Sequence, residues 1–279
     1  MASTMKNNEI LLSIITICYN QSDIEETCES IVAQTFQNFE WIVVDGGSTD
    51  GTLQKLEKYK NRINIFISEK DRGRYHAMNK GIRLAKGKYL NFMNGGDSYF
   101  EKNSLEKTMN ILQCCTKAKS GPDVLYGGTN LIFSNNDRVV DPAPQLSRKF
   151  FIANNINHQS SFIKKSLFEK YGYYNEQIKI FGDYESWLLF WKNRCKFKHM
   201  DLIVVNFKKD GISADWKDKQ YIMERANIIR KYFLTEEIND FYSSRLKFLE
   251  KIFSIKKELD YKVVRILGLK IKYKYTGIT

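Results

Sequence analysis

The chain has 279 residues, of which 43% are hydrophobic and 27% are charged, as in ordinary soluble globular proteins. Its length predicts one large domain or two small ones, with a core that needs no disulfide or metal to hold it together. With 44 Lys and Arg against 32 Asp and Glu, the net charge is +12, which excludes an acidic disordered chain. Such a charge favours a nucleic acid, an anionic membrane surface or a phosphorylated substrate as partner.

The five cysteines predict neither a disulfide framework nor a zinc site. Their number is odd, and no pair has Cys-x-x-Cys spacing, so reduced thiols in a cytosolic protein are expected. No apolar run reaches the ~18–20 residues that span a bilayer, and the run 11–17 is too short for a signal peptide. We therefore expect a cytoplasmic protein.

The first hundred residues alternate between short β-branched runs and amphipathic stretches. Strands are predicted at 12–17, 40–45, 63–67 and 88–93. Helices are predicted from 22 to 32, at 50–59 and at 75–85. Ser22 and Glu25 have the spacing of a capping box, and Gly87 is expected to cap the third helix. This alternation predicts a parallel sheet with helices on both faces.

After Asp97 the pattern is less regular. Helices are predicted at 105–112, 165–171 and 182–194, and strands at 124–133, around Val139, at 161–163 and at 202–207. From Trp216 onward the pattern is helical and basic, and residues 217–279 carry a net charge of +7. We therefore predict a domain at 5–215 and a basic helical extension at 216–279.

Polar residues follow each of the four N-terminal strands. Because the carboxyl ends of parallel strands meet at one edge of a sheet, these residues are expected to line one crevice, where ligands of open α/β sheets bind. Any one of them is more often only a turn residue, but four together favour a site. The crevice is not a P-loop, because Thr52 follows Gly51 where Lys is required. A carboxylate flanked by glycines, such as Asp97, could hold a cation that bridges a diphosphate.

Five motifs in this stretch have a characteristic order and spacing: SIITICYN (13–20), WIVVDGGSTDGT (41–52), AMNKG (77–81), AKGKYL (85–90) and NGGD (94–97). With these motifs the chain resembles family 2 glycosyltransferases of the GT-A fold. The resemblance continues more loosely through NHQSSFI (157–163) and FGDYESWL (181–188), over about the first 210 residues. It implies a Rossmann-like nucleotide-diphospho-sugar transferase, an α/β fold with a mixed, mainly parallel sheet and helices on both faces. The helical C-terminal extension would be added to that fold.

The resemblance implies transfer of a sugar from a nucleotide-diphosphate donor, usually a UDP-sugar, to an acceptor hydroxyl with inversion. At the matching positions, Asp45 would read the base, and Thr16 and Asn20 would line the nucleoside pocket. Asp71 would contact the base or ribose. Asp97 would be the last carboxylate of the Asp-x-Asp metal motif, which implies Mn²⁺ or Mg²⁺ as cofactor.

Asp183 matches the catalytic base of the family, at the start of a predicted helix. A carboxylate in a crevice can take the proton of an attacking hydroxyl when desolvation raises its pKa. Three positions depart from the family pattern. Gly95 stands where the first carboxylate of the metal motif is usual, and Gly46 stands where a second Asp is common. Gly182 stands where one acid of the pair at the catalytic base is often found. Asp183 is therefore the single obvious base, with Glu185 as second choice.

His158, Gln159 and Trp187 are expected to contact the donor or acceptor sugar. For His158 the alternative is a loop histidine bonded to backbone, and for Trp187, four residues before Trp191, it is a core position. Arg72 and Arg74 could assist the departing diphosphate. Their alternative is a solvated loop.

The basic and apolar run 263–275 suits an anionic membrane surface and so a lipid-linked acceptor. The alternative is a solvated helix or strand pair. No nucleic-acid recognition motif is present, so no nucleic-acid partner is expected. We predict an inverting hexosyl- or N-acetylhexosaminyltransferase of bacterial surface polysaccharide assembly, acting on a glycan or lipid-linked acceptor. The rivals are another nucleotide-sugar or nucleotidyltransfer enzyme on the same scaffold, and a non-catalytic basic binding module.

Overall fold

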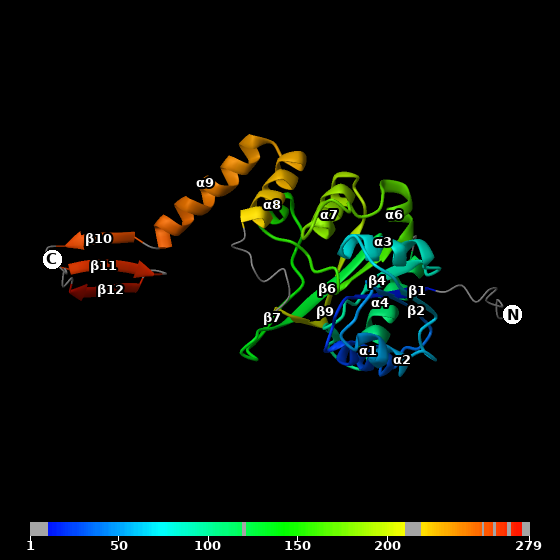
Figure 1. The fold of residues 1–279 in the computed structure, drawn as a ribbon. Coiled ribbons are helices and arrows are strands. Elements are labelled where there is room, and N and C mark those ends of the chain that lie inside the picture. Colours follow the sequence, from blue (N-terminus) through cyan, green and yellow to red (C-terminus); the bar gives the residue numbers. More distant parts are fainter. Residues whose placement is uncertain are drawn as a thin grey trace. The chain divides into compact units, whose positions relative to one another are not determined.

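The computed structural model describes residues 11–118, 121–209, 219–252, 254–258, 261–266 and 269–274 (Figure 1). The contacts within the chain divide it into two units, Met1–Ile228 and Ile229–Thr279. The polar strand ends and Asp183 all lie in the first unit.

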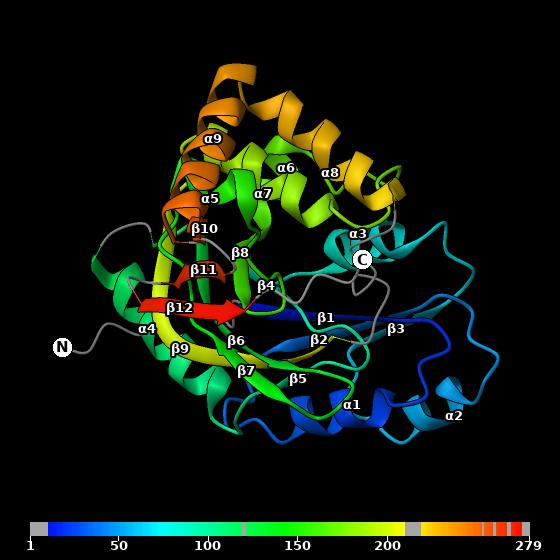
Figure 2. The same ribbon diagram turned by 90° about the vertical axis from the view of Figure 1, so that its left-hand side faces the viewer.

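The N-terminal half of the first unit is a parallel sheet. Its strands are β1 (Leu12–Cys18), β2 (Glu40–Asp45), β3 (Ile65–Ser68) and β4 (Tyr89–Phe92), in the order β3-β2-β1-β4. The connecting helices are α1 (Ile24–Val32), α2 (Thr52–Glu57) and α3 (Arg74–Leu84). Figure 2 shows α1 and α2 on one face of this sheet and α3 on the other. Strands β2 and β4 are buried along their whole length because helices cover both faces, whereas β3, at the edge, is half-exposed.

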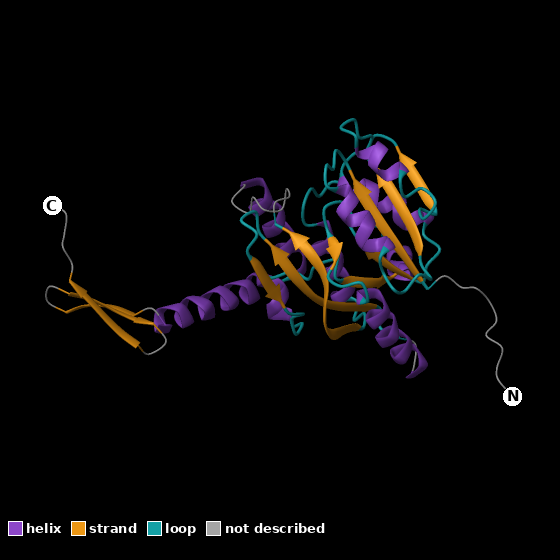
Figure 3. Ribbon diagram, turned by 90° about the horizontal axis from the view of Figure 1, so that it is seen from below, coloured by secondary structure: helices purple, strands orange, loops and turns teal. Residues whose placement is uncertain are grey.

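The second half continues the same sheet with mixed pairing. Its elements are β5 (Ser98–Tyr99), α4 (Ser104–Ala118), β6 (Val124–Ile132), β7 (Arg138–Asp141), α5 (Arg148–Ala153), β8 (Ser161–Lys164), α6 (Lys165–Tyr171), α7 (Gly182–Lys192) and β9 (Phe197–Lys208). Strand β8 is antiparallel to both β4 and β6, and β9 is parallel to β6. The order is not a strict alternation, since β7 follows β6 and α7 follows α6. Figure 3 shows the helices beside the strands of the sheet. The predicted α/β fold with a mixed sheet is confirmed, with the parallel pairing concentrated in β1–β4.

Two local predictions are wrong. Helix α1 begins at Ile24 and has no side-chain cap, so the Ser22–Glu25 capping box does not form. Helix α3 ends with Ala85 as its C-cap residue in an extended conformation, so Gly87 does not cap it. Instead, a Cβ at Gly87 would lie 2.4 Å from the backbone nitrogen of Ser13, and the glycine is needed for close approach to β1.

A cluster of aromatic rings connects β4 with α3 and α6. The ring of Phe92, at the end of β4, lies 5.6 Å from that of Tyr174 and 6.3 Å from that of Phe168. Tyr174 in turn lies 5.3 Å from Tyr75 of α3. The ring of His158 lies 6.1 Å from the ring of Phe92, and the two rings pack edge to face. These contacts tie β4, α3 and α6 together and support the histidine from below.

The C-terminal part contains two helices followed by three strands: α8 (Lys219–Tyr232), α9 (Thr235–Ile252), β10 (Ser254–Glu258), β11 (Tyr261–Ile266) and β12 (Leu269–Lys274). The three strands form an antiparallel sheet in chain order. The extension is thus helical only as far as Ile252. In these strands apolar residues such as Val and Ile alternate with Lys, which is the period of a strand. The high proportion of basic residues obscured this period in the sequence. The boundary at 215/216 stays a prediction. Among the described helices, none is long and apolar enough to cross a membrane.

Candidate active site

The carboxylate of Asp45, at the end of β2, organises the loop that follows it. One oxygen accepts hydrogen bonds from the backbone N–H groups of Gly47 and Ser48, both at 3.0 Å, and from the Ser68 hydroxyl at 2.7 Å. The other oxygen accepts from the Ser48 hydroxyl and the Cys18 thiol. The side chain is fully buried. In this structure the loop itself engages both oxygens of Asp45, and the contact of Asp45 with the base stays a prediction.

We expect Asp45→Asn to destabilise the protein by about 2–3 kcal/mol at neutral pH, since charge-assisted bonds are lost and a buried donor is introduced. Burial acts to raise the pKa of Asp45, but the bonds from Ser48, Ser68 and Gly47 outweigh it and lower the pKa. The stabilisation is thus complete above the ordinary carboxyl pKa of about 4 and is lost as the pH falls towards the lowered value. Urea unfolding from pH 7 to pH 3 measures the gap between wild type and variant. A gap that is unchanged or wider at pH 3 would contradict this role.

Asn20 joins the first two strand-end loops. Its backbone N–H donates to the Ser48 hydroxyl at 2.8 Å, and its side-chain oxygen accepts from the backbone N–H of Thr49 at 2.9 Å. Asn20 is exposed and has a left-handed backbone with φ 47°. It therefore lies at the crevice, as expected, although its side-chain oxygen is engaged with the neighbouring loop.

Asp71 lies at the same edge of the sheet. One of its oxygens binds His76 Nδ1 at 3.0 Å and Lys80 Nζ at 2.6 Å. Its other oxygen faces Gly46, where an added Cβ would lie 3.3 Å from both this oxygen and the ring of Tyr19. A side chain at position 46 would therefore be tightly confined between the carboxylate and the ring, so glycine lets both groups lie close to this backbone. Tyr19 is 64% exposed, which is unusual for a large ring at the end of a buried strand.

Asp97, after β4, is brought together with Gln159. The buried carboxylate accepts a hydrogen bond from Gln159 Nε2 at 2.8 Å and from the backbone N–H of Lys208 at 3.3 Å. The ammonium group of Lys208 is directed to α1, where it binds Asp23 at 2.7 Å and Glu26 at 2.6 Å. Burial opposes the charge of Lys208, but these two carboxylates outweigh it and raise the pKa to about 12.

Asp183, in the first turn of α7, is brought together with His158. One carboxylate oxygen lies 3.1 Å from His158 Nδ1 and accepts from Asn155 Nδ2 at 3.3 Å. The second ring nitrogen of His158 lies 3.0 Å from Asn94 Nδ2. Because an amide nitrogen only donates, Nε2 is the acceptor and Nδ1 carries the proton towards Asp183. The imidazole is thus fixed between the end of β4 and the start of α7.

Tyr75 holds the start of α7 from beneath. Its hydroxyl accepts from the backbone N–H of Gly182 at 2.8 Å, donates to the carbonyl of Ile180, and lies 3.4 Å from the Asp183 carboxylate. A Cβ at Gly182 would lie 2.7 Å from the Tyr75 ring, which explains why glycine replaces one acid of the family pair. Burial and the charge of Asp183 raise the pKa of Tyr75 well above its usual range, so the hydroxyl stays protonated.

Two predicted site residues lie in the core instead. Thr16 is fully buried within β1, and its hydroxyl accepts a hydrogen bond from the Trp41 indole at 3.0 Å. Trp187 is also fully buried, donates to the carbonyl of Ile156 at 3.1 Å, and packs beside Phe197. Neither side chain can reach a ligand, so the predictions of a nucleoside contact and of an aromatic sugar floor are wrong. The core alternative holds for Trp187.

Three buried amide groups share one arrangement at this site. Asn94, Asn155 and Gln159 donate their nitrogens to His158, Asp183 and Asp97 respectively. Since both carboxylates can only accept, the orientation of Asn155 and Gln159 is fixed by these bonds. The three amide oxygens are buried, and none has a hydrogen-bond partner within the described chain. An unpaired buried acceptor is costly, so these oxygens point to a ligand that carries several hydroxyl groups.

The described residues do not form a resident metal centre. No three His, Cys, Asp or Glu side chains among them lie close enough to share an ion. Asp97 is a lone carboxylate, flanked by Gly95 and Gly96. It fits one corner of a cation that takes its other ligands from a diphosphate and water, which is how Mg²⁺ usually binds.

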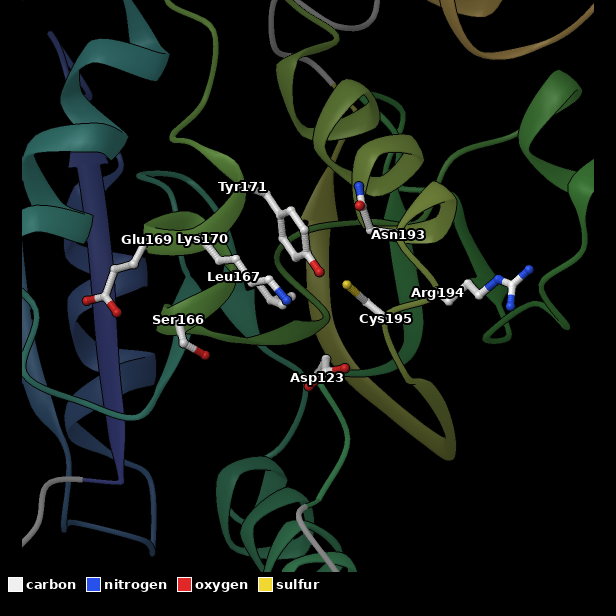
Figure 4. Close-up of a pocket in the computed structure, with 9 residues that line it drawn as sticks. All are labelled: Asp123, Ser166, Leu167, Glu169, Lys170, Tyr171, Asn193, Arg194 and Cys195. Carbon is white, nitrogen blue, oxygen red and sulfur yellow. The ribbon is translucent and has the colours of Figure 1, made fainter.

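Two of the cavities among the described residues of the first unit differ in their relation to these carboxylates. A cavity of about 300 Å³ lies between β6, the segment after β7 and the segment 154–160, and Asn155 lines it. A larger one of about 530 Å³ lies between α6 and the end of α7 (Figure 4). Figure 4 shows Lys170, Tyr171, Cys195 and Asp123 around it. It contains none of the site residues, so size alone does not mark the active site.

Tyr19 and Asn94 were expected at the crevice only as strand-end residues without a stated role, and Tyr75 and Asn155 were not singled out from the sequence. An aromatic residue directly after a buried strand is a signal for Tyr19, and the amide-rich run NNIN at 154–157 is one for Asn155. Tyr75 had no signal, because its partners are more than one hundred residues away along the chain.

A mixed α/β sheet with two carboxylates, Asp97 and Asp183, in one polar crevice defines the GT-A class of glycosyltransferases. Residues 13–172 match the family described as glycosyl transferase family 2, and the chain belongs to this family. The protein is therefore a glycosyltransferase.

Known relatives and structures agree with this assignment. The chain is 30% identical over 218 residues to the "PGL/p-HBAD biosynthesis glycosyltransferase" of Mycobacterium bovis, covering 76% of this chain and 82% of the relative. It is 31% identical over 204 residues to an uncharacterized glycosyltransferase of Rickettsia prowazekii, covering 69% and 63%. S. aureus TarS 1–349 in complex with UDP-GlcNAc superposes with a TM-score of 0.62 at 20% identity, over 86% of this chain and 73% of that one. The mannosyltransferase PcManGT from Pyrobaculum calidifontis, solved with GDP-Man and Mn²⁺, gives 0.59 at 18% identity, over 78% and 64%.

Proposed function

We propose that the enzyme transfers a sugar from a UDP-sugar to a hydroxyl of a glycan or lipid-linked acceptor, with inversion, in surface polysaccharide assembly. One observation carries this proposal. His158 and Gln159 are adjacent in the chain, and they bind Asp183 and Asp97 respectively. The carboxylate predicted beside the diphosphate and the predicted base are therefore joined by a single dipeptide.

The reaction that this arrangement supports is a single displacement. The acceptor oxygen forms a bond to the anomeric carbon as the bond from that carbon to the diphosphate oxygen breaks. Asp183 takes the proton of the attacking hydroxyl, and UDP leaves with the bonding electron pair. His158 and Asn155 hold the Asp183 carboxylate in place by hydrogen bonds. The oxygens of Gln159 and Asn94 are available to hydroxyls of the donor sugar.

The nucleoside would lie at the other end of the crevice. The exposed ring of Tyr19 offers a flat apolar surface, and an oxygen of Asp71 lies beside the same glycine, Gly46. A base could stack on Tyr19 while a base N–H or ribose hydroxyl donates to Asp71. The solved complexes of S. aureus TarS with UDP and UDP-GlcNAc, on the same fold, support UDP as the nucleotide.

Calorimetry with UDP, GDP, CDP and dTDP tests the donor class, and we expect UDP to bind at least about tenfold more tightly than GDP, as the UDP complexes solved on the same fold suggest.

A divalent cation would supply charge neutralisation for the diphosphate at Asp97. We therefore expect Mn²⁺ to raise UDP affinity over that in excess EDTA, and Asp97→Asn to remove the increment. Equal affinity in Mn²⁺ and EDTA would contradict the metal role alone.

Product analysis separates the rival reactions. A glycosyltransferase incubated with a UDP-sugar releases UDP, whereas a nucleotidyltransferase makes or consumes inorganic pyrophosphate. Phosphorus NMR distinguishes these species directly. Absence of both UDP binding and UDP release would overturn the proposed function.

The basic extension is the second part of the proposal, as the element that brings the enzyme to a membrane surface. Residues 217–279 hold fifteen Lys and Arg against eight Asp and Glu. We expect the full chain to sediment with vesicles that contain phosphatidylglycerol and not with pure phosphatidylcholine vesicles, and the binding to weaken with salt. Replacing Lys270, Lys272 and Lys274 by Ser should reduce it, whereas the same change at Lys58, Lys60 and Lys107 should not. An equal reduction of vesicle binding in both triple variants would contradict the assignment of the membrane contact to the basic extension.

A further inference from the structure

The 300 Å³ cavity is lined by side chains of two kinds. Amides and hydroxyls come from Thr129, Asn154 and Asn155, and apolar surfaces come from Pro142, Pro144 and Phe150. A pyranose ring has the same division, with hydroxyls at its edge and C–H groups on its faces. The volume is at the lower end of the ~300–1,000 Å³ of ligand sites, which suits one sugar ring and not a long chain.

Asn155 connects this cavity to Asp183. Its nitrogen donates to the Asp183 carboxylate at 3.3 Å, and its buried oxygen has no partner within the described chain. A hydroxyl group donating to this oxygen would place its neighbour on the ring close to Asp183. This oxygen requires a donor, which a sugar hydroxyl supplies.

The charge of the lining narrows the ligand further. Asp141 is the one charged side chain among the described residues that line the cavity, and it is exposed. A uronic acid or a phosphorylated sugar would meet a carboxylate and no compensating cation. The lining therefore favours an uncharged ring.

We infer that this cavity is the acceptor site, and that it takes a neutral hexose or N-acetylhexosamine with one hydroxyl directed to Asp183. The inference rests on the proposed function and extends it, since it names the chemical class of the acceptor and the residues that select it.

The test uses the full chain and simple probes. Saturation-transfer NMR is recorded in the presence of saturating UDP with the methyl glycosides of glucose, galactose, N-acetylglucosamine and N-acetylgalactosamine, and with methyl glucuronide. We expect at least one neutral glycoside to bind and methyl glucuronide not to bind. Phe150→Ala and Thr129→Val should each weaken the neutral glycoside by about tenfold, through loss of ring contact and of a hydroxyl partner. Phe66→Ala, an equal truncation on exposed β3, should leave binding unchanged.

UDP affinity, measured by calorimetry in each variant, separates the outcomes. UDP binding without any glycoside binding overturns the acceptor site and leaves the proposed function standing. Glycoside binding that is unchanged in both cavity variants, while circular dichroism shows them folded, also overturns it. Tighter binding of methyl glucuronide than of every neutral probe overturns the assigned class. If UDP itself does not bind, the proposed function fails and the acceptor assignment fails with it.

Discussion

Asp183→Asn is expected to lower kcat for sugar transfer by about 10³-fold, in the middle of the ~10²–10⁴-fold that a general base contributes. The amide keeps the size of the side chain and its place at the start of α7, but it cannot take a proton. The UDP dissociation constant should stay within about threefold, because the Asp183 carboxylate contacts His158, Asn155 and Tyr75, none of which is a predicted nucleotide residue. Initial rates of UDP release and calorimetry with UDP measure the two quantities separately.

Glu185→Gln is the matched control, since it makes the same chemical change two residues later on the same helix. Residues two apart in a helix do not face the same side, so Glu185 cannot share the position of Asp183. Transfer by Glu185→Gln should remain close to wild type. Equal loss of UDP binding and of transfer in Asp183→Asn would show that Asp183 holds the structure together and is not the base. Full loss of transfer in Glu185→Gln would move the base to that residue.

Tyr75→Phe is expected to lower the free energy of unfolding by about 1–3 kcal/mol and kcat by about 10–100-fold. The hydroxyl is buried and pairs with the Gly182 N–H and the Ile180 carbonyl, so its removal leaves both without this partner. The start of α7 then loses the group that fixes the Asp183 carboxylate. Urea unfolding gives the stability, and initial rates give kcat.

Tyr89→Phe is the control that separates an effect on the position of Asp183 from an effect on the free energy of unfolding. Tyr89 is equally buried, and its hydroxyl donates to the carbonyl of Pro122 at 2.7 Å, away from the crevice. This variant should lose similar stability while its kcat stays near wild type. If both variants show the same kcat, Tyr75 is a core residue without a positioning role for Asp183.

The sequence predicted the order of elements well because the signals were local. The largely apolar runs within 40–45 and 88–93 correspond to the fully buried β2 and β4, since strands covered on both faces are mostly apolar. The short strand β5 and helix α5 escaped prediction. Ser98–Tyr99 is too short to show a period, and its pairing with β9 joins residues about one hundred positions apart. The three C-terminal strands were hidden by lysines that alternate with apolar residues.

The candidate site residues likewise divide into those with a local signal in the sequence and those whose surroundings depend on distant segments. Asp97, Gln159, His158 and Asp183 were singled out one by one, and the structure brings them together as two bonded pairs. Thr16 was misplaced because the sequence does not show which side chains of a strand face the core. Asp45 lies at the end of β2, where its carboxylate binds the backbone of Gly47 and Ser48, and its contact with the base stays a prediction.

The order and spacing of the motifs predicted the class of protein, and the sequence also showed that +7 of the net charge of +12 lies in residues 217–279. Only the tertiary structure decided which polar groups are available to a ligand. Tyr75 contacts Gly182, and Asn155 lies between Asp183 and a cavity. Both arrangements join residues from different elements, so the local composition gives no sign of them. The unpaired amide oxygens are likewise visible only when every buried donor has been assigned to an acceptor in space, because hydrogen bonding in a folded chain is a property of the whole packing.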